Sequence, residues 1–396
     1  MKPCRKNLSL IEQRSDGNAV CAKQWQRARD LVLHYGWNAM AYQILNPGMQ
    51  LWLDPDHDAV AGYVSHAGYR VVAGAPICAF EELPAVTAAF ADDTRLACQR
   101  VCYFGIQDRL IALLSEQGPL TRFLIGAQPV WRPASWQRII VQKASIRAQV
   151  LRARNKQVMV SSWPAELAAN HVDLIRCRDE WLATRGLSPL HFLIETDTLG
   201  NLADRKIFVA ERAGRVIGFL VASPVPLRNG WLVEQIIRGR EAPNGTTELL
   251  LDAAMRDFTA NGADYVTLGL SPLSRRAEFS RTPQPLWTRL LFAGTRWCGH
   301  YFYNFDGLDA FKAKFAPDLW EPLYAVTLGK NGGIGAFYAI AGVFGGMPPT
   351  QLIGRAIVRK LAHTIRPIDR RLPSMLLAQL DTLRMVAQLS IWRERS

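Results

Sequence analysis

The sequence predicts a mixed α/β protein (α+β) built from two halves of similar size that are joined by a basic helix. Short apolar runs typical of strands alternate with stretches of helical periodicity through most of the chain. At 396 residues the chain is long enough for two domains with a sizeable core. We expect an N-terminal domain over residues 20–135, a connecting helix over 136–160, a C-terminal domain over 161–330 and a tail over 331–396.

The first half contains five apolar runs and two periodic stretches. The runs, which are expected to form strands, are residues 51–54, 60–64, 69–78, 101–106 and 121–126. The periodic stretches, which are expected to form helices, are residues 81–93 and 107–117. This alternation is the pattern of an α/β fold.

A segment between the two halves carries no acidic residue from Gln117 to Pro164. Within it, residues 136–157 have helical periodicity and contain neither Gly nor Pro, so a single helix is expected here. Ile139, Ile146 and Val150 can share one face of that helix, which leaves the cations elsewhere. Two interpretations stay open: a solvated helix that bridges two domains, or a surface that also contacts phosphate groups.

The second half repeats the alternation. A helix is expected over residues 171–186, followed by a hairpin over 207–225 that turns at Ala213 and Gly214. A strand over 231–238, a helix over 246–262 and a strand over 265–270 come next. The order strand, loop, helix, strand suits a crossover unit in a mixed sheet.

The end of the chain differs in character. Residues 331–354 carry no charge, and their apolar part, 334–347, spans only fourteen residues. A membrane-spanning helix needs roughly 20 apolar residues, so this segment is too short to cross a bilayer. A strongly basic, partly amphipathic segment follows at 355–371. An apolar wedge beside cations suits peripheral contact with an anionic membrane, and a helical hairpin packed on the core is the alternative.

Charge and cysteine content narrow the partners and the environment. The net charge of +13, with a pI near 9.6, favours polyanions such as nucleic acid or an anionic membrane. The seven cysteines are scattered and form no CxxC pair, so we expect reduced thiols and no structural metal. The N-terminus lacks an apolar core of signal-peptide length, and a cytoplasmic location is expected.

The loop within residues 236–255 runs from an expected strand into an expected helix. Thr246 and Thr247 are predicted to cap that helix, and Gly245 would let the backbone approach a ligand closely. Unpaired N–H groups at a helix start favour an anion, although a plain capped helix start is the alternative. Arg238 and Glu248 flank this junction, and acyl transfer needs both a positive charge for the ester carbonyl and a proton acceptor.

Residues 303–324 place two lysines among aromatic residues. Asp306 can cap a helix there, and Phe311 and Phe315 would form one apolar stripe with Leu308. Lys312 and Lys314 would then flank the stripe on opposite sides. Such lysines pack their stems along an apolar seam in most cases, and the alternative is that at least one points into a neighbouring cleft.

Several stretches together resemble the catalytic domain of lysylphosphatidylglycerol synthases and their soluble relatives. The resemblance covers roughly residues 30 to 328. It rests on HYGWNAMAYQILNPG (34–48), VVAGAPIC (71–78), FLIGAQPVW (123–131), APNGTTELL (242–250), DYVTLGLSPLS (264–274) and YNFDGLDAFKAKFAPDLWEPLY (303–324). Each motif is weak alone, and their occurrence in this order is specific.

The resemblance implies tandem GNAT-like acyltransferase folds joined by the basic helix, with the second fold catalytic. It also implies transfer of an aminoacyl group from aminoacyl-tRNA to a hydroxyl of a membrane lipid such as phosphatidylglycerol. No cofactor is expected beyond aminoacyl-tRNA as co-substrate. Family members often carry a multi-helix membrane domain ahead of the catalytic part, and this chain shows none, so contact with the inner membrane face is expected to be peripheral.

The resemblance and the charge pattern assign three groups of site residues. The expected catalytic residues, which would stabilise an oxyanion, bind phosphate or accept a proton, are Arg238, Glu248, Lys312 and Lys314. The expected substrate-binding residues are Glu234, Gln235, Asn244, Gly245, Thr246, Ser271, Tyr303 and Asn304. The expected contacts to tRNA phosphates are Arg138, Lys143, Arg147, Arg152, Arg154 and Lys156.

One position departs from the family pattern. Many relatives have an acidic residue in an Asp-x-x-Arg pattern at the end of the strand, where this chain has Gln235 and retains Arg238. Glu234 lies beside it, but adjacent strand residues face opposite sides, so Glu234 is not expected to take the place of the aspartate. The amino acid, the acceptor and the oligomeric state are left open by the sequence.

Two other functions fit parts of the sequence. An acyl-CoA-dependent N-acyltransferase of the GNAT type would bind a pyrophosphate at the loop of Gly245, whose glycine-rich pattern matches only loosely. A catalytically silent membrane or RNA-binding relative would account for Gln235. Retention of Arg238, Glu248 and both lysines argues against the silent relative.

Overall fold

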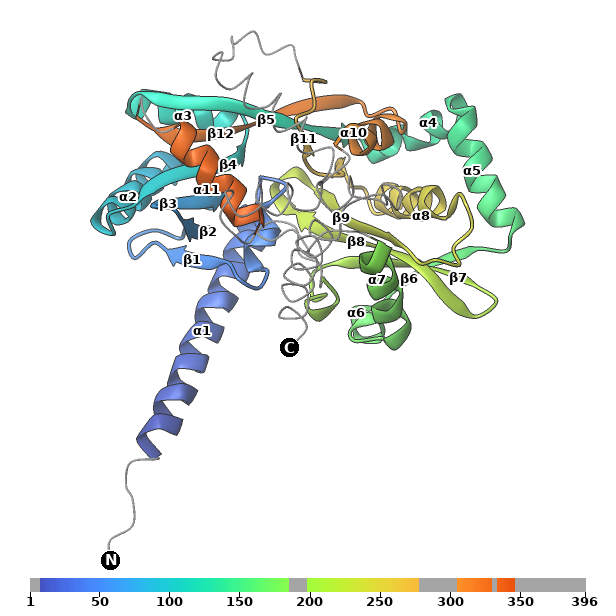
Figure 1. Ribbon diagram of the computed structural model, residues 1–396, viewed down its shortest axis with the longest axis horizontal. Coiled ribbons are helices and arrows are strands. Elements are labelled where there is room, and N and C mark those ends of the chain that lie inside the picture. Colours follow the sequence, from blue (N-terminus) through green and yellow to red (C-terminus); the bar gives the residue numbers. More distant parts are fainter. Residues whose placement is uncertain (1–7, 185–197, 278–304, 330–332, 346–396) are drawn as a thin grey trace, which may run out of the picture. The chain divides into compact units, whose positions relative to one another are not determined.

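The computed structural model describes residues 8–184, 198–277, 305–329 and 333–345, with side chains from residue 21 onward (Figure 1). These residues belong to one compact unit. Its helices are α1 (Leu8–Tyr35), α2 (Leu83–Leu96), α3 (Asp108–Gln117), α4 (Trp136–Gln142), α5 (Ala144–Asn155), α6 (Ala165–Ala168), α7 (Val172–Thr184), α8 (Thr246–Ala260), α10 (Phe305–Ala313) and α11 (Gly333–Gly345).

One mixed sheet of twelve strands runs through the described part of the chain. Its order is β1-β2-β3-β4-β12-β5-β10-β9-β8-β7-β6, and β11 pairs with β5 beside this path. The strands are β1 (Gln50–Leu53), β2 (Val60–His66), β3 (Tyr69–Ala73), β4 (Arg100–Ile106), β5 (Leu120–Trp131), β6 (Met159–Trp163), β7 (Lys206–Arg212), β8 (Arg215–Val225), β9 (Gly230–Arg238), β10 (Tyr265–Thr267), β11 (Ser271–Pro272) and β12 (Leu319–Leu328).

The first half forms a meander followed by a crossover. β1, β2 and β3 pair antiparallel, and β4 then pairs parallel to β3 after the chain has passed through α2. Leu83, Val86 and Phe90 of α2 are buried at the spacing of one helical face, which packs the helix against the sheet. Pro84 lies in the first turn, where its missing N–H costs no hydrogen bond.

The second half repeats this order. β6, β7, β8 and β9 pair antiparallel, and β10 pairs parallel to β9 after α8. The predicted hairpin is confirmed, because Ala213 and Gly214 have φ of 50° and 73°, as a tight two-residue turn between twisted strands requires. The predicted crossover over 231–270 is also confirmed, although its last strand ends at Thr267.

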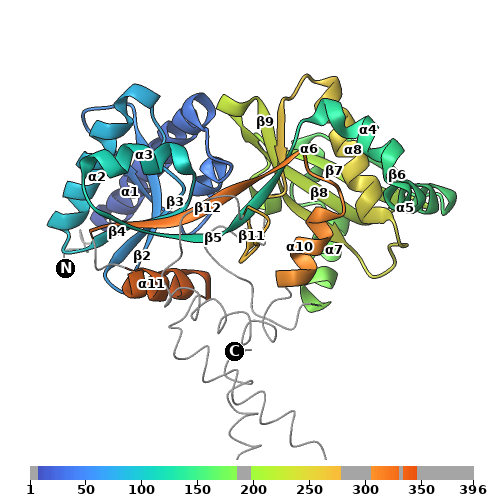
Figure 2. The same cartoon turned by 90° about the horizontal axis from the view of Figure 1, so that it is seen from above.

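Two long strands join the halves. β5 pairs with β10 of the second half, and β12 lies between β4 and β5, antiparallel to both (Figure 2). The last strand of the sheet in chain order therefore completes the sheet of the first half. The α/β prediction is confirmed, and this exchange of a strand between halves was not predicted.

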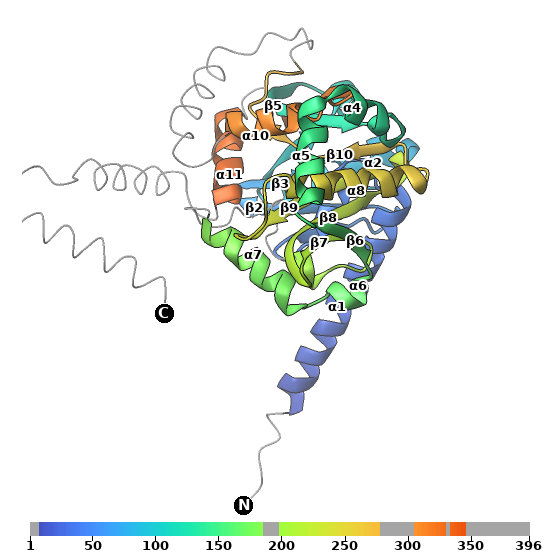
Figure 3. The same cartoon turned by 90° about the vertical axis from the view of Figure 1, so that its right-hand side faces the viewer.

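The connecting helix is interrupted, contrary to the prediction of one helix over 136–157. α4 and α5 meet at Lys143, whose ψ of 85° leaves the helical region. Arg147 donates to the carbonyl oxygens of Ile140 (3.3 Å) and Val141 (2.6 Å), which the break leaves free at the end of α4. Ile146 and Val150 of α5 are buried against α8, as the shared face predicted (Figure 3).

α11 covers part of the first half of the sheet. It packs on β2 and β3, and Ala336, Ala339, Ile340 and Val343 join the core there. One face of the apolar helix therefore packs on the core, as the alternative prediction had it. Only the opposite face could contact a membrane. Ile334 is 72% exposed on the other side of the helix. The basic segment 355–371 lies outside the described residues.

Candidate active site

Lys312 in α10 and Lys314 directly after it have different partners. Phe315, just after the helix, is fully buried, and its carbonyl accepts a hydrogen bond from Trp131 Nε1 at 2.9 Å. This anchor fixes the end of α10 against β5. The predicted helix and the predicted separation of Lys312 and Lys314 to opposite sides of the stripe are both confirmed.

Lys312 points inward. The residue is 5% exposed, and its Nζ donates to the carbonyl oxygens of Gly269 (2.9 Å) and Leu270 (2.8 Å) in the loop that follows β10. Desolvation lowers the pKa of Lys312 to about 7, and nearby Asp309 opposes that shift. A buried amine with a pKa near neutrality, beside the end of a central strand, is typical of catalytic groups, although structural lysines show the same property.

Lys314 points toward α8. Its Nζ lies 2.5 Å from Glu248 Oε1, and it lies 5.0 Å from the ring centroids of both Phe311 and Phe315. Glu248 belongs to the first turn of α8, where a carboxylate is favoured by the helix dipole. The structure thus brings two of the four predicted catalytic residues into one ion pair, although they are 66 positions apart in the sequence.

The start of α8 is closed by packing. Gly245 precedes the helix with a φ of +96°, and a Cβ at this position would lie 2.0 Å from the carbonyl oxygen of Gln149 in α5. Thr246 is fully buried and donates to the carbonyl oxygen of Pro243 at 2.7 Å. The predicted side-chain cap is therefore wrong, because the hydroxyl of Thr246 has another acceptor and Gly245 occupies the cap position without a side chain.

This packing also bears on the acyl-CoA alternative. A pyrophosphate site needs backbone N–H groups at the helix start that are open to a ligand. Here the glycine serves a close approach between α5 and α8, so the loop has a structural role that the sequence did not reveal. Arg238 remains exposed beside the loop, with Nη1 3.4 Å from Asn244 Oδ1.

A β-bulge separates Glu234 from Gln235. The register between β8 and β9 shifts so that Gln235 pairs with Val221 while Val233 pairs with Ala222, which leaves Glu234 as the extra residue. Glu234 forms a buried ion pair with Arg205 at 2.9 Å, whereas Gln235 accepts a hydrogen bond from Thr198 at 3.0 Å. The two side chains thus have separate partners, and the carboxylate of Glu234 is occupied by its ion pair with Arg205.

Of the remaining predicted substrate-binding residues, Ser271 lies within the described part of the chain. Ser271 opens β11 directly after Leu270, and its buried hydroxyl has no hydrogen-bond partner in the described part of the chain. Tyr303 and Asn304 lie outside the described residues. Ser271 therefore lies next to the backbone that Lys312 binds, which places it close to the inner end of α10.

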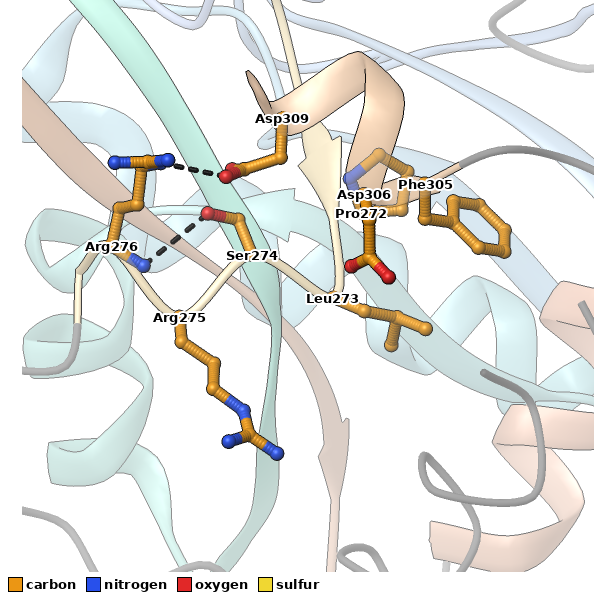
Figure 4. Close-up of a pocket in the computed structure, with 8 residues that line it drawn as sticks. All are labelled: Pro272, Leu273, Ser274, Arg275, Arg276, Phe305, Asp306 and Asp309. Carbon is orange, nitrogen blue, oxygen red and sulfur yellow. Dashed lines mark hydrogen bonds and ion pairs between the residues drawn. The ribbon is translucent and has the colours of Figure 1, made fainter. Parts of the chain in front are cut away.

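A pocket of about 270 Å³ opens beside the start of α10 (Figure 4). Arg276 Nε lies 2.6 Å from Asp309 Oδ2 at its wall, and the backbone N–H of Arg276 donates to Ser274 Oγ at 3.3 Å. This pocket could not be predicted from the sequence, because its walls come from the end of β11 and the start of α10. They are Pro272, Leu273, Ser274, Arg275, Arg276, Phe305, Asp306 and Asp309.

Sequence reasoning also missed a polar network that joins the two halves. Arg228 makes a bidentate ion pair with Glu321 (2.9 and 2.6 Å), and Gln128 and Gln107 donate to the same carboxylate at 2.7 and 3.0 Å. Burial alone would raise the pKa of Glu321, but the bonds from Arg228 hold it below its usual value. These residues come from separate strands and loops, so only the fold brings them together.

The predicted tRNA-binding cations fall into two classes. Arg154 pairs with the buried Asp252 at 3.1 Å, and Arg138 lies 3.9 Å from Asp318. These two have structural partners. The other four are exposed and have no carboxylate within 4 Å among the described residues; they are Lys143, Arg147, Arg152 and Lys156.

The described residues contain neither a metal-binding cluster nor a membrane-spanning helix. They contain no cluster of three or more histidine, cysteine or carboxylate side chains that would hold a metal ion. No helix among them combines the length and the apolar character that crossing a bilayer requires.

Comparison with known proteins agrees with the resemblance. The profile of the family described as "Phosphatidylglycerol lysyltransferase, C-terminal" matches residues 29–327. A phosphatidylglycerol lysyltransferase of Bacillus subtilis (strain 168) is 23% identical over 293 residues, which are 73% of this chain and 33% of that protein. The chain therefore spans about a third of the length of this curated relative.

Solved structures share the fold. The C-terminal domain of a putative lysylphosphatidylglycerol synthetase from Agrobacterium fabrum has a TM-score of 0.69 and 21% identity, covering 82% of this chain and 98% of that one. L-PGS from Bacillus licheniformis has a TM-score of 0.67 and 20% identity, covering 83% and 96%. Since the family profile extends over most of its length, the chain belongs to the family of phosphatidylglycerol lysyltransferase C-terminal domains.

Proposed function

We propose that this protein is an aminoacyltransferase that moves an aminoacyl group from aminoacyl-tRNA to a hydroxyl of a phosphatidylglycerol-like lipid. The observation that carries the proposal is the family match over residues 29–327, which includes α8, α10 and the loop after β10. The relative from Bacillus subtilis is a phosphatidylglycerol lysyltransferase, a name that specifies phosphatidylglycerol as acceptor and a lysyl group as the group transferred. The charge of +13 supports two polyanionic partners, tRNA and an anionic lipid.

The reaction needs positive charge more than it needs a strong base. The lipid hydroxyl attacks the ester carbonyl of the aminoacyl group, a new ester forms, and the bond to the ribose oxygen of tRNA breaks. The proton of the attacking hydroxyl ends on the released ribose oxygen, so no oxidant, reductant or further cofactor is consumed. Lys312 would stabilise the oxyanion of the intermediate, and Glu248, held by Lys314, would orient the amine or relay the proton.

Transfer RNA is assigned to α5. Four exposed cations have no carboxylate partner among the described residues: Arg147 and Arg152 lie in this helix, and Lys143 and Lys156 flank its two ends. Each neutralised phosphate releases counterions, so binding should weaken steeply with salt. Replacing Lys143, Arg147 and Arg152 with Ala is expected to weaken tRNA binding and to flatten its salt dependence. The control is Arg138→Ala, because Arg138 already has Asp318 as a partner.

The lipid surface is assigned to α11 and the tail after it. Ile334 and Tyr338 are exposed on one side of an uncharged helix, and the basic residues of 355–371 follow in the sequence. We therefore propose a cytoplasmic protein that attaches peripherally to the inner face of the membrane. Deleting residues 350–396 tests this with α11 left in place, because removal from 331 onward would uncover core residues such as Ile340. Loss of vesicle binding with unchanged tRNA affinity is the expected result.

The direct test is product formation. Purified protein, lysyl-tRNA labelled in the lysyl group and phosphatidylglycerol vesicles should yield a labelled lipid, and RNase added beforehand should abolish the product. Other charged tRNAs, tested in parallel, identify the amino acid. If no charged tRNA gives a labelled lipid, the proposed function is wrong. If acyl-CoA supports transfer in the presence of RNase, the acyl-CoA alternative replaces it.

A further inference from the structure

A second pocket lies in the first half of the sheet and is not used by the proposed reaction. It opens beside the start of α3, and its buried walls include Asn38, Ile77, Leu83, Gln107 and Leu110. The pocket measures about 40 Å³. One water needs roughly 10–15 Å³ by this measure, so the pocket holds about three water-sized groups. Arg109 is the one fully charged side chain among its lining residues.

Arg109 is held between two aromatic rings. Its guanidinium carbon lies 4.6 Å from the ring centroid of Trp37 and 4.1 Å from that of Phe80. Stacking fixes the plane of the guanidinium and leaves its N–H groups at the edge, where they match the oxygens of a phosphate. Asp108 precedes Arg109 in the chain, and Glu81 is the carboxylate whose charge acts on it. Within the described residues neither carboxylate forms an ion pair or a hydrogen bond with Arg109.

A second arginine, Arg228, also stacks on Trp37 but has a carboxylate partner. The guanidinium carbon of Arg228 lies 4.9 Å from the same ring centroid, and its charge is balanced by the bidentate pair with Glu321. Arg109 has no such partner in the described part of the chain. Burial lowers the pKa of Arg109, and the nearby charge of Glu81 opposes that shift without forming an ion pair with the guanidinium. A bound anion would supply the missing partner.

We propose that Arg109, clamped by Trp37 and Phe80, binds the phosphate group of a phosphate ester at the mouth of this pocket. Bidentate hydrogen bonds from a stacked guanidinium recognise a tetrahedral oxyanion with defined geometry. The small pocket takes the first atoms attached to that phosphate, and it is too small for a nucleotide base or an acyl chain. The ester is the headgroup phosphodiester of the acceptor lipid, an assignment that rests on the proposed function.

Chemical protection tests the site in the unmodified protein. Phenylglyoxal modifies accessible arginines, and mass spectrometry of peptides reports each position. Glycerol 3-phosphate and phosphatidylglycerol vesicles are expected to slow modification of Arg109 and to leave Arg95, a 77% exposed arginine in the same half, unaffected. Phosphatidylcholine vesicles are the lipid control. Protection by glycerol 3-phosphate without protection by phosphatidylglycerol supports the phosphate site and overturns its assignment to the lipid. Equal modification with and without every phosphate overturns the proposal.

Variants give the second readout. Arg109→Gln should weaken binding of glycerol 3-phosphate about 10- to 100-fold, as expected for loss of charge-assisted hydrogen bonds. Arg109→Lys should fall between this variant and the native protein, because a lysine keeps the charge and loses the fork. Phe80 is 45% exposed, so Phe80→Ala should fold and should weaken binding by a smaller factor. Arg95→Gln, which removes the same charge, should bind as the native protein does.

The two proposals fail in different ways. If labelled lipid forms and Arg109→Gln leaves the KM for phosphatidylglycerol unchanged, the assignment of the site to the acceptor lipid is wrong and the proposed function stands. If no charged tRNA gives a product while glycerol 3-phosphate still protects Arg109, the site stands and the proposed function is wrong. If the KM rises with little change in kcat, both are supported, because Arg109 then contributes to binding of the acceptor.

Discussion

The two crossover units of the sheet share a topology and differ in chemistry. β3, α2 and β4 in the first half follow the same order as β9, α8 and β10 in the second. The register of β3 is regular, whereas β9 carries a bulge at Glu234. α2 begins with Pro84 in its first turn, whereas α8 begins at Gly245 against α5.

The difference shows that the crossover alone does not decide which charged groups come together. Glu248 of α8 forms an ion pair with Lys314, which lies directly after a later helix, α10. In the first half Arg109 lines the smaller pocket and stacks on the rings of Trp37 and Phe80. The same backbone arrangement therefore accompanies an ion pair in one repeat and a cation held between aromatic rings in the other. Four predictions test what the second repeat has added.

The largest effect on stability is expected from the bulge in β9. Glu234→Gln removes the carboxylate from Arg205, whose side chain is fully buried. Breaking a buried ion pair from one side costs roughly 3–5 kcal/mol, because the remaining charge is uncompensated. Urea unfolding should show this loss, and Glu241→Gln at an exposed position should change the free energy of unfolding by less than about 0.5 kcal/mol. Equal stability of the two variants would mean that the bulge is not a structural device.

The glycine before α8 should give the next largest effect. Gly245→Ala introduces both a left-handed alanine and a Cβ that would lie 2.0 Å from the backbone of Gln149. Strain and overpacking together predict a loss of about 2–4 kcal/mol. Gly214→Ala is the matched control, since its φ is also positive and no atom lies within 4 Å of the added Cβ. The difference between the two unfolding free energies measures the packing of α5 on α8, and a difference near zero would contradict the close approach.

The buried amine of Lys312 predicts that stability depends on pH. Desolvation lowers its pKa to about 7 from 10.5, so between these values the unfolded chain binds more protons than the folded one. Stability should therefore rise with pH across this window, by at most about 1.4 kcal/mol per pH unit, and the penalty of the buried charge is largest below pH 7. Lys312→Met should abolish this slope in urea unfolding. Because the charged form would stabilise the oxyanion, transfer activity should fall as the pH rises above 7, and a rising rate would assign Lys312 as a base instead.

The smallest effect on stability is expected at the other lysine. The pair of Lys314 and Glu248 is partly exposed, at 37% and 11% of the side chains, so its coupling energy should not exceed about 1 kcal/mol. A double-mutant cycle with Lys314→Met and Glu248→Gln measures that coupling in unfolding and in transfer activity. A much larger coupling in activity than in stability would support a role in the reaction. Equal couplings would mean that the pair only holds α8 to α10.

Local features of the sequence were sufficient for most elements. The hairpin at Ala213 and Gly214 follows from a turn that needs positive φ, and the helices α2, α3 and α8 follow from apolar periodicity. The sequence also predicted that Lys312 and Lys314 would diverge, since their angular separation on a helix depends only on residue spacing. The prediction of a single helix over 136–157 was wrong at Lys143, because neither glycine nor proline marks the break in the sequence. The side chain of Arg147 donates hydrogen bonds to the carbonyl groups that the break leaves free.

By itself, the sequence determined most of the strands and helices, the basic character and the family, because these depend on short-range periodicity and on motifs in order. Only the tertiary structure decided which charged groups meet. Lys314 and Glu248 are 66 positions apart, and Arg228 and Glu321 are 93 apart. The insertion of β12 between β4 and β5 is likewise invisible in the chain, since strand order is set by packing of the whole sheet. The physical reason is that ion pairs and strand neighbours are selected by burial and geometry after the chain has folded, and spacing along the sequence does not encode them.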